Sequence, residues 1–124
     1  MNELILRKNG GFYSVYGDDC YILFYLLGYK IVGDKVGFPI SAYNKVINIL
    51  EENNINYRSD KNAYNCRKKN RYNKVIELGK KKCKLKYRID NIIEKMNLLN
   101  EEDIDNILSY IESYERQIFN CKKN

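Results

Sequence analysis

Residues that could perform acid–base or nucleophilic chemistry are few in this chain of 124 residues. Histidine, the commonest general base and the usual partner of a catalytic serine or cysteine, is absent. The carboxylates cluster at Asp18-Asp19, Glu51-Glu52 and Glu101-Glu102-Asp103, which are positions typical of helix ends and solvated faces. We therefore expect no catalytic residue and a protein that is not an enzyme.

The four cysteines lie far apart and form no Cys-x-x-Cys pair. A mixed zinc site would also lack its histidine ligands, and free thiols suit a reduced compartment. Cys20 falls within an apolar run, so we expect it to be a small core residue. We predict no bound metal and no cofactor.

Positive charge is concentrated in one block of the sequence. Residues 58–88 contain thirteen Lys or Arg against only Asp60 and Glu77, and tyrosines are interleaved with them. Cations mixed with aromatic rings are what phosphate pairing and base stacking use, although a solvated helix face with a linker would have the same composition. We expect a nucleic-acid partner, with DNA favoured. The candidate contacts are Arg67, Lys68, Lys69, Arg71, Lys80, Lys81, Lys82 and Lys84, with Tyr57, Tyr64, Tyr72 and Tyr87 interleaved.

The first half of the chain has the pattern of short strands and two helices. Residues 4–7 and 11–16 are predicted strands around a turn at 8–10, and Gly33-Asp34 predicts a hairpin turn between strands at 29–32 and 35–38. Asp18 or Asp19 is expected to cap a helix over residues 20–27, which ends at Gly28. Ser41 is expected to cap a second helix, which ends at Asn53. Residues 55–58 would complete a single mixed sheet.

The second half is predicted to be a basic loop followed by two helices. Residues 59–73 lack apolar periodicity, and residues 75–96 fit one long helix with a possible break at Gly79, although residues 82–89 alternate as a strand would. Asn100 and the acids after it indicate a second helix start, and an apolar stripe follows from Ile104 to Ile118. The short connection between the helices favours an antiparallel hairpin.

The expected fold class is therefore α/β (α+β), a small mixed β-sheet flanked by helices and followed by a C-terminal α-helical hairpin. We place the sheet domain at residues 1–58, a basic linker or loop at 59–73 and the hairpin at 74–124. The hairpin would pack on the domain or on a second subunit, which makes a homodimer through residues 74–120 possible. No stretch has the roughly 18 to 20 apolar residues of a membrane span, and the start of the chain lacks a signal pattern, so we expect a cytoplasmic protein.

One colinear set of motifs resembles a known family. Gly11-Phe12-Tyr13-Ser14-Val15-Tyr16-Gly17-Asp18-Asp19 is followed by a helix that ends in Leu27-Gly28, then by Gly37-Phe38-Pro39 and Ala42-Tyr43. Order and spacing are similar to those of the N-terminal mismatch-recognition domain of the DNA repair protein MutS, over about residues 10–57. The resemblance implies a mixed sheet with flanking helices.

In that family a phenylalanine wedges beside a mispaired base from the minor groove, and a glutamate two residues later hydrogen-bonds to the base. Phe12 matches the wedge, and Ser14 stands where the glutamate would be, so the resemblance implies DNA contacts at both positions with poor discrimination among mismatches. The phosphate-binding loop of the family's ATPase is absent from this chain. The alternative function is a protein-interaction or assembly module that uses the C-terminal helices.

Overall fold

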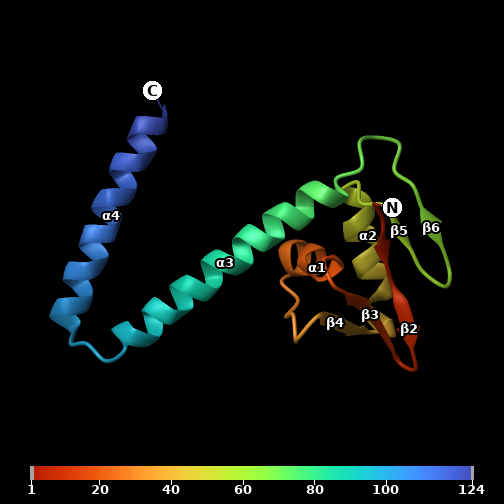
Figure 1. Ribbon diagram of the computed structural model, residues 1–124, viewed down its shortest axis with the longest axis horizontal. Helices are drawn as coiled ribbons and strands as arrows, with labels where there is room; N and C mark the ends of the chain where they lie inside the picture. The colour runs from red at the N-terminus through yellow and green to blue at the C-terminus, as the bar shows by residue number, and fades with distance from the viewer. Residues whose placement is uncertain (1, 124) are drawn as a thin grey trace. The chain divides into compact units, whose positions relative to one another are not determined.

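A computed structural model describes residues 2–123 of this chain (Figure 1). The chain is mixed α+β and divides into two compact units, one up to Leu85 and one from Lys86. No helix in residues 2–123 combines the length and the apolar character needed to cross a membrane. The elements are β1 (Leu4–Ile5), β2 (Arg7–Asn9), β3 (Phe12–Tyr16), α1 (Asp19–Leu27), β4 (Lys35–Pro39), the 3-10 turn η1 (Ile40–Ala42), α2 (Tyr43–Glu52), β5 (Tyr57–Arg58), β6 (Ala63–Tyr64), α3 (Tyr72–Met96) and α4 (Glu101–Lys123).

The strands form two small sheets, so the expectation of one mixed sheet is wrong in detail. The first sheet has the order β1-β5-β6, in which β1 is parallel to β5 and β6 is antiparallel to it, and the second is the antiparallel sheet β2-β3-β4. The chain changes sheets at Leu6, whose N–H still donates to the carbonyl of Arg58 (2.8 Å), whereas Arg7 already pairs with Ser14. Figure 1 shows β2, β3 and β4 side by side.

Several local predictions are confirmed and others are corrected. Gly28 has the left-handed backbone (φ 73°) that ends α1, as expected. Asp18 occupies the N-cap position of α1 without a side-chain cap bond, and Ser41 lies within η1, so neither caps a helix through its side chain. The predicted hairpin around Gly33 is reduced to one bridge between Val32 and Lys35, and β4 pairs along its length with β3.

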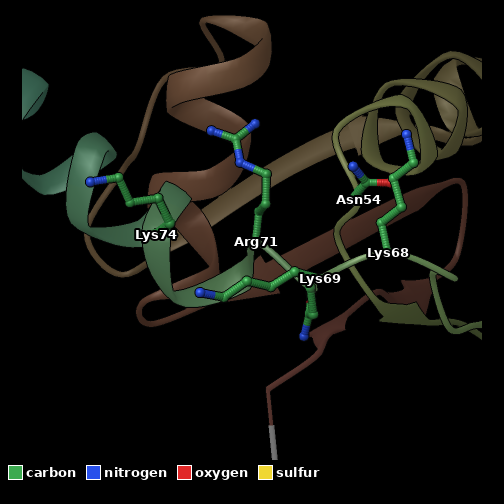
Figure 2. Close-up of a pocket in the computed structure, with 6 residues that line it drawn as sticks. Asn54, Lys68, Lys69, Arg71 and Lys74 are labelled. Atoms are coloured by element: carbon green, nitrogen blue, oxygen red, sulfur yellow. The ribbon is translucent and has the colours of Figure 1, made fainter.

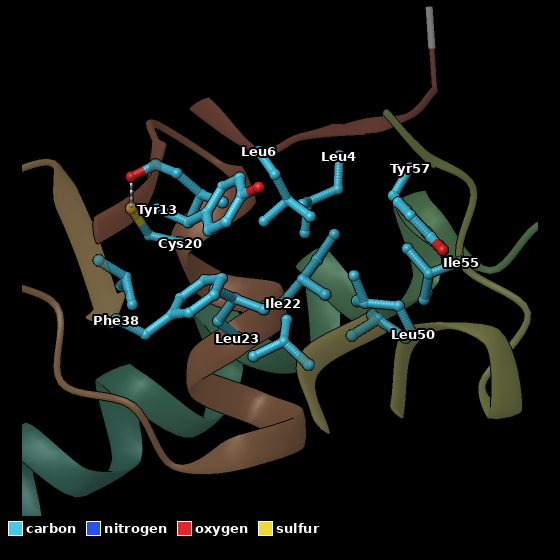
Figure 3. Close-up of a cluster of buried hydrophobic side chains, with 14 of the residues drawn as sticks. Leu4, Leu6, Tyr13, Cys20, Ile22, Leu23, Phe38, Leu50, Ile55 and Tyr57 are labelled. Atoms are coloured by element: carbon cyan, nitrogen blue, oxygen red, sulfur yellow. Dashed lines mark hydrogen bonds between the residues drawn. The ribbon is translucent and has the colours of Figure 1, made fainter. Parts of the chain in front are cut away.

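The core of the first unit draws on nearly all of its elements. Figure 3 shows Leu4 and Leu6 near the N-terminus, Ile22 and Leu23 of α1, and Leu50 of α2 gathered in one cluster of buried side chains. Cys20 is buried in it, as predicted, and its thiol donates to the carbonyls of Val15 and Asp34. Val75 and Ile76 of α3 belong to the same cluster, so the unit extends beyond the predicted boundary at residue 58.

Helix α3 is continuous through Gly79 and through residues 82–89, which settles the choice between helix and strand there. Gly79 is buried because α3 approaches α1 closely at this point. A Cβ atom on Gly79 would lie 2.4 Å from the carbonyl oxygen and 2.8 Å from the Cβ atom of Tyr21. Glycine is therefore required here by the packing of two helices and does not mark a break.

A buried carboxylate joins three elements of the first unit. Asp19, at the start of α1, is 8% exposed and accepts a hydrogen bond from the N–H of Ile5 in β1 (3.0 Å). It accepts a second from the hydroxyl of Tyr72, the first residue of α3. Burial raises the pKa of Asp19 above its usual value of 3.8, although both hydrogen bonds favour the charged form. Asp19 thus fixes the start of α3 against α1 and β1.

The second unit contains the end of α3 and all of α4. Asn100 caps α4 as predicted, because its Oδ1 accepts the N–H of Asp103 (2.8 Å). Within the second unit the apolar stripe of α4 is largely exposed, however, and Ile107 and Ile111 are 36% and 47% exposed. The end of α3 in this unit therefore leaves most of that stripe uncovered.

We predict that Gly79→Ala destabilises the first unit. The new methyl group must push α1 and α3 apart, at a cost of about 1–3 kcal/mol that exceeds the gain in helix propensity of roughly 1 kcal/mol. Thermal and urea unfolding measure the effect, and Glu77→Ala at an exposed position of the same helix is the control, expected within about 0.5 kcal/mol of the parent. A melting temperature above that of the parent would show that the helices do not touch here.

We also predict that Asp19 makes stability depend on pH. The folded chain binds the carboxyl proton more tightly than the unfolded chain, so this stabilisation is complete below about pH 3.8 and is lost as the pH rises through the raised pKa. Asp19→Asn keeps an acceptor and removes the titration. In urea denaturation, the stability of the parent relative to Asp19→Asn should fall from about pH 4 to about pH 7, by roughly 1.4 kcal/mol for each pKa unit. A difference that stays constant with pH would contradict the assignment.

Candidate nucleic-acid interface

The basic loop is held to the turn after α2 by side-chain and backbone hydrogen bonds. Asn54 adopts a left-handed backbone (φ 57°), and its carbonyl accepts the N–H of Arg71 (2.9 Å). The Oδ1 atom of Asn70 accepts the N–H groups of Asn56 and Tyr72, while its Nδ2 donates to the carbonyl of Asn2. This network fixes the backbone just before α3 and so sets where the neighbouring cationic side chains begin.

Those cationic side chains line a shallow hollow of about 390 Å³, which we call the basic hollow. In Figure 2, Lys68 extends beside Asn54, and Arg71 extends in the same general direction from the neighbouring stretch of chain. Its lining contains no carboxylate and consists of Asn54, Lys68, Lys69, Asn70, Arg71 and Lys74.

The chemistry of the basic hollow suits a phosphate group. An arginine guanidinium can donate two parallel hydrogen bonds to phosphate oxygens, and lysine ammonium groups add positive charge from several directions. Helix α3 begins at Tyr72, so the positive end of its dipole lies at the same place. The structure thus brings together Lys68, Lys69 and Arg71 of the predicted contacts.

Two of the predicted contacts already have partners within the first unit. The ammonium of Lys80 is 3.3 Å from the carboxylate of Asp18 and lies 5.7 Å from the ring centre of Tyr21. The ammonium of Lys82 lies 5.5 Å and 5.7 Å from the ring centres of Phe24 and Tyr25. These lysines pack α3 against α1, so a change at either alters the fold as well as the surface charge.

The other predicted lysine and arginine contacts are exposed away from the lining of the basic hollow. Arg67 lies in the loop before it, and Lys81 and Lys84 lie on α3. Within residues 2–123, these three side chains form no ion pair and lie over no aromatic ring. Their charges add to the positive potential of the first unit, but these side chains do not line the basic hollow.

Phe12 and Ser14 lie on the solvent side of the sheet β2-β3-β4 but differ in exposure. Phe12 is 56% exposed, so its ring is available to a partner, whereas Ser14 is 2% exposed between Arg7 and Gly37 on the adjacent strands. The side chain of Ser14 is therefore not accessible for the predicted contact in this structure. Tyr16, two positions further along the same face, is 41% exposed.

Three of the four tyrosines interleaved with the basic block, Tyr57, Tyr64 and Tyr72, make contacts within the first unit, whereas Tyr87 is 70% exposed. Tyr57 is fully buried, with its hydroxyl donating to Glu51 (2.6 Å), and it stacks on Tyr64. Tyr72 donates to Asp19, and Tyr13 of β3 donates to Asp60 (2.7 Å). Burial raises the pKa of Tyr13 to about 12, as expected for a phenol held neutral in the core.

Sequence reasoning missed four residues of these surfaces, namely Lys74, Tyr16, Asn54 and Asn70. Lys74 follows Arg71 by three residues, so the first turn of a helix brings both to one side. Tyr16 follows Phe12 by four residues, an even number that places both on one face of a strand. Asn54 gave no such signal, because its place beside the loop depends on contacts between distant segments.

Comparisons with known proteins found no relative of this chain. No family profile matches the chain, and no curated protein or solved structure is found to be similar to it. The resemblance to the MutS domain therefore remains a prediction that depends on the motifs themselves.

Proposed function

We propose that this chain is a non-catalytic protein that binds nucleic acid, DNA in preference, with weak sequence specificity. The basic hollow is the observation that carries the proposal. Four cations meet there without a carboxylate in the lining, and the hydrogen bonds of Asn54 and Asn70 hold the backbone that presents them. Phosphates are common to every nucleic acid, so contacts of this kind give affinity without reading sequence.

The exposed ring of Phe12 supports a second contact that depends on nucleic-acid structure. Phe12 and Tyr16 stand on one face of β3, about 13 Å apart at roughly 3.3 Å per residue, so each ring would meet a different base. Arg7 and Lys35 are exposed on the same face and would pair with phosphates beside those bases. An accessible phenylalanine is also what the proposed resemblance to the MutS domain requires.

Base-specific recognition is not part of the proposal, because Ser14 is buried and offers no carboxylate. Phe12 can act only where a base is already unpaired or where a base step opens at low cost. We therefore propose a preference for mismatched, bulged or single-stranded nucleic acid over plain duplex. The sequence of the bases should matter little.

The basic hollow is tested by the double variant Lys68→Ala/Lys69→Ala. Both side chains line the hollow and form no ion pair within residues 2–123, so their removal should leave stability unchanged. Binding to all nucleic acids should weaken to a similar extent, and the slope of log affinity against log salt on duplex should decrease by about 0.9 for each phosphate that is no longer neutralised. Fluorescence anisotropy at several salt concentrations measures both quantities.

The matched control is Lys30→Ala/Lys45→Ala, which removes the same charge from exposed positions outside the hollow. It should have a smaller effect than the hollow variant on affinity and on salt slope. Equal effects of the two variants would show that net charge alone governs binding, and the hollow would lose its assigned role. No binding by the parent at low salt would end the nucleic-acid proposal.

Phe12→Ala tests the structure-dependent contact separately. Loss of base stacking costs about 1–3 kcal/mol where a base is accessible, so affinity for mismatched, bulged and single-stranded substrates should fall by a factor of roughly 5 to 150. Plain duplex should be almost unaffected. Val32→Ala, at an apolar residue that is 68% exposed, is the control for removal of an exposed apolar side chain. A uniform decrease in affinity for every substrate would contradict the stacking role of Phe12 and would leave the proposed role of the basic hollow unaffected.

A further inference from the structure

The second unit exposes most of its apolar side chains. In residues 86–122 the large side chains at 89, 92, 93, 107, 108, 111, 114 and 118 are all between 36% and 58% exposed. Isolated apolar residues on a surface are ordinary, but a continuous set along two helices marks an interaction surface. The spacing, width and charge of this surface decide which partner it fits.

The spacing of these residues is that of a coiled coil. On α4, apolar residues alternate at intervals of three and four, and on α3 a shorter run does the same. This is the repeat of the core positions a and d in packed helical bundles, and it keeps one stripe facing a partner helix over several turns. The a and d residues are Ile89, Ile92 and Met96 on α3, and Ile104, Ile107, Ile111, Tyr114 and Ile118 on α4.

The width of the stripe indicates more than two helices. Ile93 and Leu108 occupy the position next to d, so each helix has an apolar face broader than a two-stranded seam. Isoleucine at both a and d also favours bundles of three or four helices over pairs. One chain supplies two such helices, which is fewer than a bundle of three or four needs.

The charges of the two helices differ within the proposed interface. In residues 86–96, α3 has three Lys or Arg against two Asp or Glu, whereas α4 up to residue 122 has six Asp or Glu against two Lys or Arg. The acidic excess of α4 disfavours two α4 helices side by side, so an α3 end beside an α4 is favoured. A second copy of this chain supplies the same pair of helices, so each α4 can lie beside an α3 end.

We propose that two copies of this chain associate through residues 86–122, with their α3 ends and α4 helices forming a four-helix bundle. The inference is independent of nucleic-acid binding. Its first test is the mass of the intact chain in solution without nucleic acid, by sedimentation equilibrium. Twice the chain mass of 14.8 kDa is expected. A monomer at the highest concentration reached, or a trimer, would overturn the proposal.

The second test places charges on the stripe. Ile107→Asp/Ile111→Asp puts two carboxylates at core positions and should convert the dimer into a monomer. Asn106→Asp/Ser109→Asp adds the same charge at exposed positions outside the stripe of α4 and should remain a dimer. Dissociation of the control, or a dimer in the stripe variant, would contradict the interface. Because the mass of the parent is measured independently, a stripe variant that unfolds does not weaken the test.

Discussion

The buried carboxylate of Asp19 is the interaction on which the arrangement of the first unit depends. It lies at the start of α1, and it accepts hydrogen bonds from β1 and from the first residue of α3. A charged group in this position costs free energy unless its partners remain in place, so a movement of α3 away from α1 removes the hydroxyl of Tyr72 and leaves the carboxylate with the N–H of Ile5 alone. The start of α3 is also an edge of the basic hollow, and Asp19 thereby links the core to the candidate site.

Sequence alone predicted those elements whose signals are local. Gly28 ends α1 and Asn100 caps α4, because a left-handed residue and a capping side chain act within one helical turn. Ser41 was misplaced as a cap, since the chain first makes a 3-10 turn there. The division into two sheets could not be predicted, because strands as short as β1 and β5 are defined only by pairing between segments more than fifty residues apart.

The basic composition of the candidate site could be predicted from the sequence, but which lysines and arginines line the hollow could not. The block of lysine and arginine is visible in the sequence, but Lys80 and Lys82 pack on the rings of α1 while Lys68 and Arg71 meet in the hollow. The position of a lysine in the sequence does not show whether it packs on an aromatic ring or lines the hollow, because this depends on the residues of the neighbouring element. The tyrosines show the same limit, since Tyr57 and Tyr72 use their hydroxyls to bind carboxylates of the first unit and are not free to stack.

The two proposals reinforce one another through the number of phosphate contacts. A hollow lined by four cations releases few counterions, and contacts of that number give weak binding at physiological salt. If the chain is the proposed dimer, it presents two hollows, and a nucleic acid that spans both would meet the second at a raised effective concentration. Affinity then rises without any further contact in the chain, provided that the nucleic acid is long enough to reach both hollows. The exposed stripe of α4 would in this way convert a weak phosphate site into an effective binding surface.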